Sequence, residues 1–382
     1  MASIDLEDVH VVYRRSGSGV HGIDLGVADG EFVALVGPSG SGKTTLLRAI
    51  AGFIRPQSGS LRIGEKQVHG PGSWVPPQKR DLGMVFQQHA IWPHWSVGRN
   101  VAYPLRLRGV GAGERRRRVE EALAQVGLEG AADRRPDTLS GGQRQRVAIA
   151  RALVTRPAAL LLDEALSSLD EPLRARLQLE LKELASEFGL TVVHVTHDRS
   201  EALSLADRIM VLRDGRTQQI AEPATLLHEP ANPFVASFMA DATVVEGRVA
   251  TGDGGTTRFT PTGRSSALEI DRIEPRGTTT SGEGVLAILP DDVEVVTADE
   301  PGAIAGTVRS VLFERSGYTT VIDLVDSSMR IDGLRSAPRI GEPLHVRVRR
   351  ALLFDAENDP GEGTGDRSAM SAGSPAPEGA TA

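Results

Sequence analysis

The sequence contains no cysteine, and aromatic residues make up only 4% of its 382 positions. Without cysteine the chain can form no disulfide bond, no thiolate zinc site and no cysteine-ligated iron–sulfur cluster. A reducing compartment fits this composition. The apolar fraction of 40% and the charged fraction of 24% are ordinary for a globular protein, and the length is sufficient for two domains.

An excess of positive charge is also missing, as is any long apolar segment. The formal net charge is -7, whereas a protein that neutralises nucleic-acid phosphates needs a basic domain or stripe, so we expect no nucleic-acid partner. The one basic run, residues 115–118, is interleaved with glutamates and is typical of a solvated helix face. No apolar run reaches the ~18 residues of a membrane-spanning helix, and no secretory signal is visible at the N-terminus. If the protein acts in transport, other chains must cross the membrane.

Hydrophobic patterning divides the chain into two predicted domains and a tail. Residues 1–240 alternate strands and helices, which predicts an α/β domain with a parallel sheet and a helical insertion over about 88–156. Residues 242–352 change to short strands with glycine turns, which predicts a small all-β domain. Residues 357–382 contain almost no large apolar side chain, so we expect a disordered tail.

Within the first domain, aliphatic and β-branched runs predict strands over 4–13, 31–36, 58–63, 158–163, 191–196 and 208–212. Helices are predicted over 43–51 and 114–126. A further helix after residue 170 should cover one face of the sheet with an apolar stripe, because large apolar residues recur there at spacings of three and four. The stripe consists of Leu173, Leu177, Leu181, Leu184 and Phe188.

The segment 37–44 reads G-P-S-G-S-G-K-T and fits the phosphate-binding pattern G-x-x-x-x-G-K-[ST], directly after a predicted strand and before a predicted helix. A glycine-rich turn that merely contains lysine would not need that context. Its backbone N–H groups and the helix dipole would bind the phosphates of ATP. We expect Lys43 to contact the β- and γ-phosphates, and Thr44 to ligate Mg²⁺. The predicted nucleotide-binding residues of this loop are Gly37, Ser39, Gly40, Gly42, Lys43, Thr44 and Thr45.

Two acids end the buried strand predicted over 158–163. Asp163 is expected to hold Mg²⁺ through water, and Glu164 to polarise the water that attacks ATP. Such a pair can also be a helix N-cap followed by a first-turn acid. The phosphate-binding loop in the same chain favours the catalytic interpretation.

A second anion site is indicated at Ser140, Gly141, Gly142 and Gln143. Ser140 is a predicted N-cap, and the glycines leave N–H groups bare at a helix start, although an ordinary capped helix is the alternative. With its flanks, this segment matches the signature motif of the ABC family, and the first domain resembles an ABC ATPase, an α/β P-loop fold. The resemblance implies a head-to-tail homodimer around two ATP molecules, in which Ser140 and Gly142 contact the γ-phosphate in trans.

Four more positions match family motifs. The resemblance implies that Tyr13 stacks on adenine, that Gln87 touches Mg²⁺ or water, and that Asp170 lies at the dimer seam. It also implies that His197 is the switch histidine, which bonds the γ-phosphate and orients the water of Glu164. Taken alone, each residue could have a purely structural role.

Residues 242–352 resemble the oligonucleotide-fold-like (TOBE) regulatory domain of importer ATPases. The resemblance implies integral-membrane permeases as partners, a periplasmic or lipid-anchored solute-binding protein as an indirect partner, and a peripheral location at the cytoplasmic face of the membrane. Trp92, Pro93 and Trp95 are expected to form a partly exposed patch for a membrane partner, or else to be buried in the insertion.

Segments 76–81 and 91–94 favour iron(III) or a polyamine or quaternary amine as the transported solute. A sugar-type importer, an ABC exporter subunit and a soluble ABC ATPase outside transport are the alternatives. The family usually has proline after the catalytic glutamate, where this chain has Ala165. We expect this difference to loosen the following loop without changing the chemistry.

Overall fold

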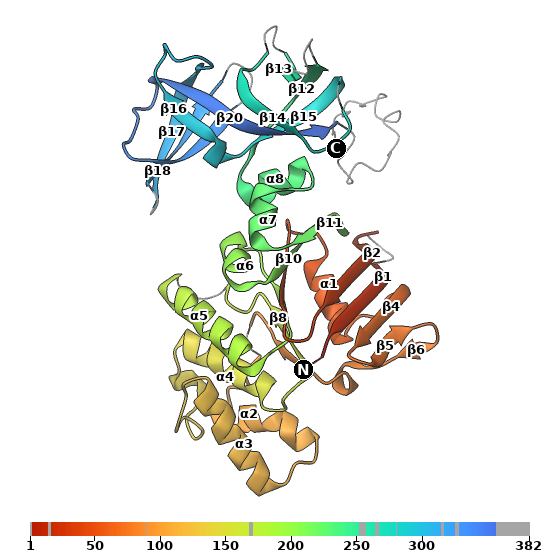
Figure 1. Cartoon of the computed structure of the whole chain (residues 1–382). Helices are drawn as coiled ribbons and strands as arrows, with labels where there is room; N and C mark the ends of the chain where they lie inside the picture. Colours follow the sequence, from red (N-terminus) through yellow and green to blue (C-terminus); the bar gives the residue numbers. More distant parts are fainter. Residues whose placement is uncertain are drawn as a thin grey trace, which may run out of the picture.

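The computed structural model describes residues 2–13, 17–88, 90–167, 171–251, 257–263, 267–279, 281–314, 317–324 and 328–356. They form an α/β domain and a β domain, joined by α7 (Pro223–His228) and α8 (Pro233–Ala240) (Figure 1). The predicted tail over 357–382 and Asp170 lie outside the described residues. No helix in the described ranges is long and apolar enough to cross a membrane.

A six-stranded sheet forms the centre of the α/β domain, in the order β11-β10-β3-β9-β8-β7. All neighbours are parallel except β10 and β11. Every residue of β3 and β8 is buried, because both faces of the sheet are covered. The strands are β3 (Phe32–Val36), β7 (Leu82–Val85), β8 (Ala159–Asp163), β9 (Val192–Val195), β10 (Arg208–Arg213) and β11 (Arg216–Ala221).

An antiparallel sheet covers one face of this centre, with helix α1 (Lys43–Ala51) between the two sheets (Figure 1). Leu46, Leu47 and Ile50 of α1 are fully buried there. The helix ends at Gly52, whose φ of 88° is the left-handed conformation expected of a C-terminal glycine. The strands of the second sheet are, in order, β2 (Gly19–Val27), β1 (Ile4–Val12), β4 (Ser58–Ile63), β5 (Lys66–Gly70) and β6 (Ser73–Trp74).

Helices cover the other face of the central sheet. The predicted stripe on α5 is buried at Leu177 and Leu181 and partly buried at Leu173 and Leu184. Phe188 is an exception: as the last residue of α5 it lies outside the apolar cluster and is 38% exposed, so its predicted burial is wrong. The helices on this face are α4 (Gly141–Leu153), α5 (Glu171–Phe188) and α6 (Arg199–Leu205). Helices α2 (Val97–Leu107) and α3 (Ala112–Gln125) pack against α4 at the foot of the molecule (Figure 1). The segments η1 (Pro77–Lys79) and η2 (Pro136–Thr138) are single 3₁₀ turns.

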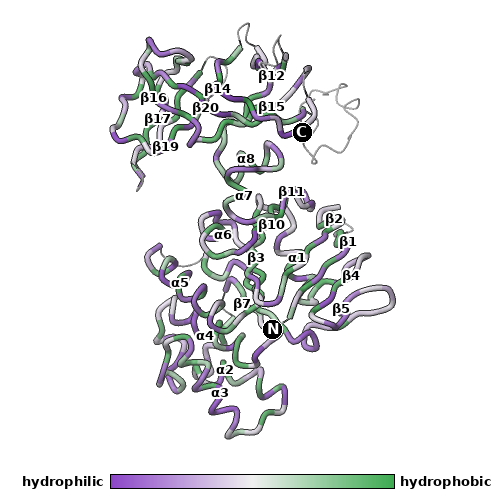
Figure 2. Tube along the Cα trace, viewed as in Figure 1, coloured by the Kyte–Doolittle hydropathy of each residue, from purple (hydrophilic) through white to green (hydrophobic). Residues whose placement is uncertain are grey.

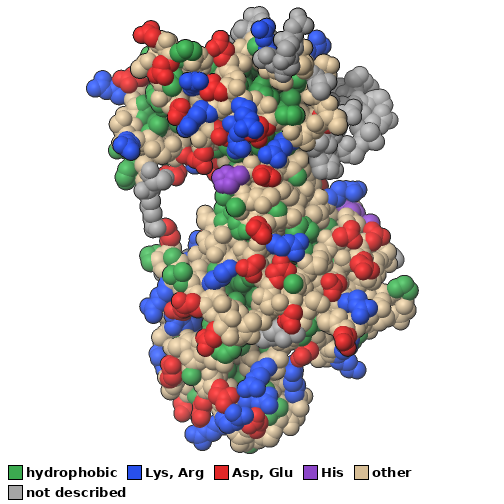
Figure 3. Space-filling model, viewed as in Figure 1, with side chains coloured by type: hydrophobic (Ala, Val, Ile, Leu, Met, Phe, Trp, Pro, Cys, Tyr) green, Lys and Arg blue, Asp and Glu red, His purple; other side chains and the backbone are tan. Residues whose placement is uncertain are grey.

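The basic run on α3 lies at the foot of the molecule in the space-filling view, with red and blue side chains interspersed (Figure 3). Arg117 and Arg118 both pair with Glu114, and Arg116 pairs with Glu120 at 3.0 Å. The hydrogen bonds from Arg117 and Arg118 lower the pKa of Glu114 to about 2. The run therefore forms a solvated helix face, as its sequence predicts.

The β domain is a nine-stranded sheet with its own apolar core, and stretches of its strands are coloured as hydrophobic in Figure 2. Val346 and Val348 of β20 are fully buried, as their alternation with arginines predicts. The strands are β12 (Thr243–Thr251), β13 (Thr257–Pro261), β14 (Ile270–Pro275), β15 (Gly282–Ile288), β16 (Val293–Val296), β17 (Ile304–Glu314), β18 (Gly317–Asp323), β19 (Ser328–Leu334) and β20 (Pro343–Asp355), and η3 (Pro290–Asp292) precedes β16.

Two kinds of contact join the domains. Ala236 on α8 and Ala242 just after it pack against Leu352 and Phe354 of β20 in one apolar cluster. In addition, Asp241, the C-cap of α8, lies between an arginine of the α/β domain and an arginine of the β domain. Arg199 Nη1 is 2.8 Å from Asp241 Oδ1, and Arg330 Nη1 is 3.7 Å from Asp241 Oδ2.

Candidate functional site

The phosphate-binding loop connects β3 to α1, and its glycines have backbone conformations that other residues rarely adopt. Gly42, the N-cap of α1, has φ 100°. A Cβ atom there would lie 2.5 Å from Val20 Cγ1 and 2.9 Å from the carbonyl oxygen of Gly19. As a glycine, Gly42 has no side chain that could cap α1. The first N–H groups of α1 therefore remain available for an anion.

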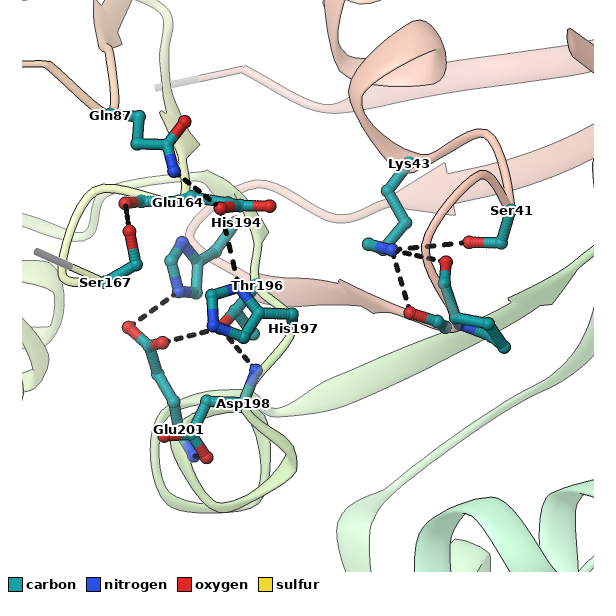
Figure 4. Close-up of polar contacts among 12 residues, drawn as sticks. Ser41, Lys43, Gln87, Glu164, Ser167, His194, Thr196, His197, Asp198 and Glu201 are labelled. Carbon is teal, nitrogen blue, oxygen red and sulfur yellow. Dashed lines mark hydrogen bonds and ion pairs between the residues drawn. The ribbon is translucent and has the colours of Figure 1, made fainter.

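Lys43 lies folded against this loop (Figure 4). Its Nζ donates hydrogen bonds to the carbonyl oxygens of Gly37 at 2.8 Å and Pro38 at 2.9 Å, and it is 3.4 Å from Ser41 Oγ. Burial lowers the pKa of Lys43, and the nearby charge of Glu164 acts in the opposite direction. The ammonium is thus poorly hydrated, which strengthens its attraction to a phosphate that enters the loop.

A cavity of about 650 Å³ opens beside the loop and brings together most of the predicted nucleotide contacts. Tyr13, at the end of β1, is 42% exposed, and its hydroxyl is 3.4 Å from Thr45 Oγ1. A ring exposed in this way is available for stacking on a base. The lining residues are Tyr13, Ser18, Gly19, Ser39, Gly40, Gly42, Lys43, Thr44, Thr45, Glu164 and His197.

Asp163 ends β8 and is only 8% exposed. Burial raises the pKa of its carboxyl group, while the charge of Arg48 and a hydrogen bond from Thr44 lower it. Asp163 and Thr44 are therefore neighbours at the carboxyl end of the sheet, as the predicted metal site requires. Their oxygens, with the amide oxygen of Gln87, are hard donors that suit Mg²⁺.

The described residues include no group of three His, Cys, Asp or Glu side chains that could hold a metal ion by themselves. A magnesium ion at a nucleotide site usually takes part of its coordination from substrate phosphates and water. Thr44, Asp163 and Gln87 would supply the protein ligands.

Glu164 adopts an unusual backbone conformation and receives two contacts at one oxygen. Its φ of 47° is left-handed, which is costly for a residue with a side chain and is common at functional sites. Gln87 Nε2 donates to Glu164 Oε2 at 2.9 Å, and His197 Nδ1 lies 3.4 Å from the same oxygen. Three of the four side chains predicted to act in catalysis, with Lys43 as the fourth, thus meet at the edge of the cavity (Figure 4).

The signature residues lie elsewhere. Ser140 is the N-cap of α4, as predicted: its Oγ accepts from Gln143 N at 3.2 Å, and Gln143 Oε1 accepts from Ser140 N at 3.1 Å. Gly142 packs against α5 so closely that a Cβ would lie 2.7 Å from Leu173 Cδ2. Among the described residues that line the cavity of the phosphate loop, none comes from α4.

The aromatic stretch after Gln87 forms a half-exposed cluster. The ring centroids of Trp92 and Trp95 are 4.7 Å apart, and Trp92 and Tyr103 are 4.8 Å apart. Trp92 and Trp95 are partly buried, whereas Pro93 is exposed. The structure therefore agrees with a partly exposed patch and not with burial of the whole stretch in the core of the insertion.

Sequence reasoning missed Arg80, which is only 2% exposed and caps the C-terminus of α1. Its Nη1 donates at 2.7 Å to the carbonyl oxygens of Ala49 and of Ile50, and its guanidinium lies 4.6 Å from the ring of Trp74. Burial lowers the pKa of Arg80 to about 10. A basic residue after two prolines gives no sequence signal for this role.

Comparison with known proteins places these features in a family. Residues 20–167 match the family model described as "ABC transporter". The chain is 42% identical to the spermidine/putrescine import ATP-binding protein PotA of Marinobacter nauticus, over 85% of this chain and 87% of that protein. It is 38% identical to the sn-glycerol-3-phosphate import ATP-binding protein UgpC of Cupriavidus pinatubonensis, over 94% of this chain and 98% of that protein.

A solved structure, the dimeric post-hydrolysis state of the ATP-binding cassette MJ0796 bound to ADP and Pi, aligns with 57% of this chain and 98% of its own, with a TM-score of 0.51 and 35% identity. These matches confirm the predicted fold, a P-loop ABC ATPase followed by an all-β region. Similarity along nearly the whole length of two import ATP-binding proteins shows that this chain belongs to the ABC transporter family, as an ATP-hydrolysing subunit of the importer type.

Proposed function

We propose that this chain binds MgATP in the cavity beside the phosphate loop and that Glu164 activates water for hydrolysis to ADP and phosphate. The supporting observation is the meeting of Glu164, Gln87 and His197 at the edge of that cavity. A water held by Glu164 would lie beside a γ-phosphate held by Lys43, which is the arrangement that phosphoryl transfer to water needs.

Each side chain then has one task. Lys43 and the first N–H groups of α1 bind the β- and γ-phosphates. Glu164 accepts a proton from water as the water oxygen bonds to the γ-phosphorus. The bond from that phosphorus to the bridging oxygen breaks, ADP leaves with the bridging oxygen, and the proton passes from Glu164 to the released phosphate. His197 donates to the γ-phosphate and stabilises its developing charge. Mg²⁺, held by Thr44, Asp163 and Gln87, would neutralise charge on the phosphates when bound.

The active unit that we propose is a head-to-tail homodimer. In one chain α4 does not contribute to the cavity, yet its N-terminus carries the glycines and N–H groups of an anion site. Ser140, Gly141, Gly142 and Gln143 of one copy would close over the ATP of the other. Asp170 would lie at the seam between the copies. The dimeric ATP-binding cassette structure with 35% identity supports this arrangement.

We further propose that the dimer works at the cytoplasmic face of the membrane on integral-membrane permeases, and indirectly with a solute-binding protein. The half-exposed patch at Trp92, Pro93 and Trp95 would be the contact for a permease. A polyamine or quaternary amine is the first cargo candidate, supported by the relative named for spermidine and putrescine import. Uptake of glycerol 3-phosphate or a sugar is the second, supported by the relative named for glycerol 3-phosphate import. Iron(III) remains a prediction from sequence alone.

The catalytic assignment is tested by Glu164→Gln, which keeps the size of the side chain and removes its charge. We expect ATP binding to remain, steady-state hydrolysis to fall at least about 100-fold, and an ATP-bound dimer to accumulate on size-exclusion chromatography. Glu187→Gln makes the same change on the exposed face of α5 and should behave as the unmodified chain. A Glu164→Gln monomer that hydrolyses ATP at the unmodified rate would contradict the assignment.

The transport assignment is tested by affinity purification from native membranes, with the co-eluting chains identified by mass spectrometry. Recovery of permeases and a solute-binding protein is the expected result, and the ligand of that binding protein would identify the cargo. Recovery of ribosomes or nucleic acid alone would overturn the transport role and leave the ATPase assignment standing.

A further inference from the structure

A buried polar cluster lies directly beneath the loop that carries His197. His194 on β9, Thr196 after β9 and Glu201 on α6 have exposed fractions of 0%, 2% and 2%. His194 is the one polar residue of β9, and it pairs in the sheet with Leu162, next to Asp163. The cluster therefore lies between the central sheet and α6, at the carboxyl end of the strands, where the proposed catalytic residues meet (Figure 4).

One carboxylate oxygen of Glu201 accepts a hydrogen bond within the cluster, and the other lies within ion-pair distance of His194. His194 Nε2 is 3.0 Å from Oε1, and Thr196 Oγ1 donates to Oε2 at 2.6 Å. Burial raises the pKa of Glu201, but its contacts with His194 and Thr196 and the charge of Arg174 together lower it by more. Glu201 is thus a carboxylate at neutral pH, and hydrogen bonds to a buried carboxylate are short and strong.

These hydrogen bonds extend to the backbone on the far side of His197. Thr196 Oγ1 accepts a hydrogen bond from Asp198 N at 3.0 Å. Asp198 in turn is the N-cap of α6, with its Oδ1 accepting from Ser200 N at 2.9 Å and from Glu201 N at 3.3 Å. The residues on both sides of His197 are therefore fixed, while the His197 side chain itself is 61% exposed.

Arg174 adds a contact from α5, with its Nη1 3.4 Å from Asp198 Oδ2. The loop is consequently tied to β9, α5 and α6 at once. Burying three polar side chains costs free energy that apolar side chains of similar volume would avoid. A purely structural contact between β9 and α6 would not need them, whereas one fixed loop conformation does.

We propose that His194, Thr196 and Glu201 form a positioning unit that sets the backbone of residues 196–198, so that His197 faces Glu164 and the γ-phosphate. The inference rests on the proposed role of His197. None of the three touches the cavity, so they act through His197 and are not catalytic residues themselves. Loss of the unit should misplace the imidazole, and a misplacement of about 1 Å can reduce the rate about 100-fold.

The decisive variant is Thr196→Val, which keeps the shape of the side chain and removes the hydroxyl that connects Glu201 to Asp198 N. In the full-length chain with MgATP, we expect kcat to fall roughly 10- to 100-fold while KM for ATP changes less than about twofold, because Lys43 and Tyr13 are untouched. Thr196→Ser restores the hydroxyl and should recover most of kcat.

Thr191→Val is the matched control. Thr191 precedes β9, has an exposed fraction of 0%, and its Oγ1 accepts from Gly30 N at 2.9 Å at the opposite end of the strand. The same substitution therefore removes an equally buried hydroxyl far from His197. We expect it to lower the melting temperature by a similar amount and to leave kcat unchanged. A Thr191→Val variant that loses as much kcat as Thr196→Val would overturn the proposal.

A double-mutant cycle separates this inference from the proposed function. If Thr196 acts through His197, Thr196→Val should cause no further loss in single-turnover hydrolysis of radiolabelled ATP when His197 is already alanine. Additive losses would show that Thr196 acts by another route and would overturn the positioning unit. If His197→Ala alone left hydrolysis unchanged, the proposed role of His197 would fail first, which is a distinguishable result.

Discussion

Helices α1 and α4 both begin at glycine-rich segments, yet they differ in whether the N-cap side chain binds their first N–H groups. The N-cap of α1 is Gly42, which offers no side chain, and among the described residues no side-chain hydrogen bond caps that helix. The N-cap of α4 is Ser140, which forms a reciprocal capping box with Gln143. The start of α1 therefore leaves its donors for a ligand, whereas the start of α4 satisfies two donors by itself.

This difference suggests an order of events. An uncapped helix start next to a poorly hydrated ammonium is a strong anion site, because its partial charges have no internal partner. A capped start is stable when empty and has less to gain from an anion. We therefore expect ATP to bind first at α1, and α4 of a second copy to close on it afterwards.

Lys43→Met gives the largest expected effect, because it removes the charge on which the α1 site depends. We expect ATP affinity to fall at least about 100-fold, since a charged contact to phosphate in a desolvated site is worth several kcal/mol. Equilibrium binding of a fluorescent ATP analogue measures this loss. Lys66→Met is the matched control, because the Lys66 ammonium is exposed and lies away from the cavity. An ATP affinity left unchanged by Lys43→Met would contradict the proposed difference between the starts of α1 and α4 as anion sites.

Asp163→Asn should have a smaller effect than Lys43→Met, and it should raise the stability of the folded protein. The folded chain raises the pKa of Asp163, mainly by burial. A carboxyl group with a raised folded-state pKa destabilises the fold once the pH exceeds that pKa, and it has no such effect below its unfolded-state pKa. The variant should therefore raise the melting temperature of the nucleotide-free protein at pH 7 by roughly 2–4 °C.

The pH dependence is the check on this prediction. In differential scanning calorimetry the gain should shrink as the pH falls through the range in which the carboxyl group of Asp163 takes up a proton. The same variant should lose ATP hydrolysis, which would show that the charge of Asp163 lowers the stability of the fold but is needed for activity. A gain that persists unchanged in acid would contradict the electrostatic explanation.

Ser140→Ala has the smallest expected effect. Removing the N-cap of α4 should lower the free energy of unfolding by about 1 kcal/mol in urea titrations, and Ser140→Asn, which keeps a capping oxygen, should restore most of it. ATP affinity of the monomer should stay unchanged in both, because α4 does not line its own cavity. A fall in monomer ATP affinity in step with the lost cap would mean that the two helix starts are not independent.

Local patterns predict the phosphate loop well because every part of it is close in sequence. The predicted bounds of α1 and the predicted N-cap at Ser140 both agree with the structure, which adds the reciprocal bond from Gln143. Strand β2 was missed, since its segment contains three glycines and no continuous apolar run. Its burial comes from pairing with β1, which is a tertiary contact.

The candidate site likewise depends on contacts between residues that are far apart in the sequence. Motifs indicate Glu164 and His197 individually, but the left-handed backbone of Glu164 and its shared contact with Gln87 depend on three loops that meet only in the folded chain. His194 and Glu201 lie on different elements and carry no pattern that would pair them. In the β domain, β20 pairs with β14 in parallel and with three other strands antiparallel, an arrangement of long-range contacts that short alternating runs do not encode.

Asp241 connects the β domain to the helix that directly follows the loop of His197. Its carboxylate is shared between Arg330 of that domain and Arg199, the first residue of α6 and the second residue after His197. A rotation of the β domain that carries Asp241 with it must either break the Arg199 ion pair or pull on the first turn of α6. One residue, Asp198, and the shared carboxylate of Asp241 thus separate His197, the residue proposed to sense the γ-phosphate, from the β domain.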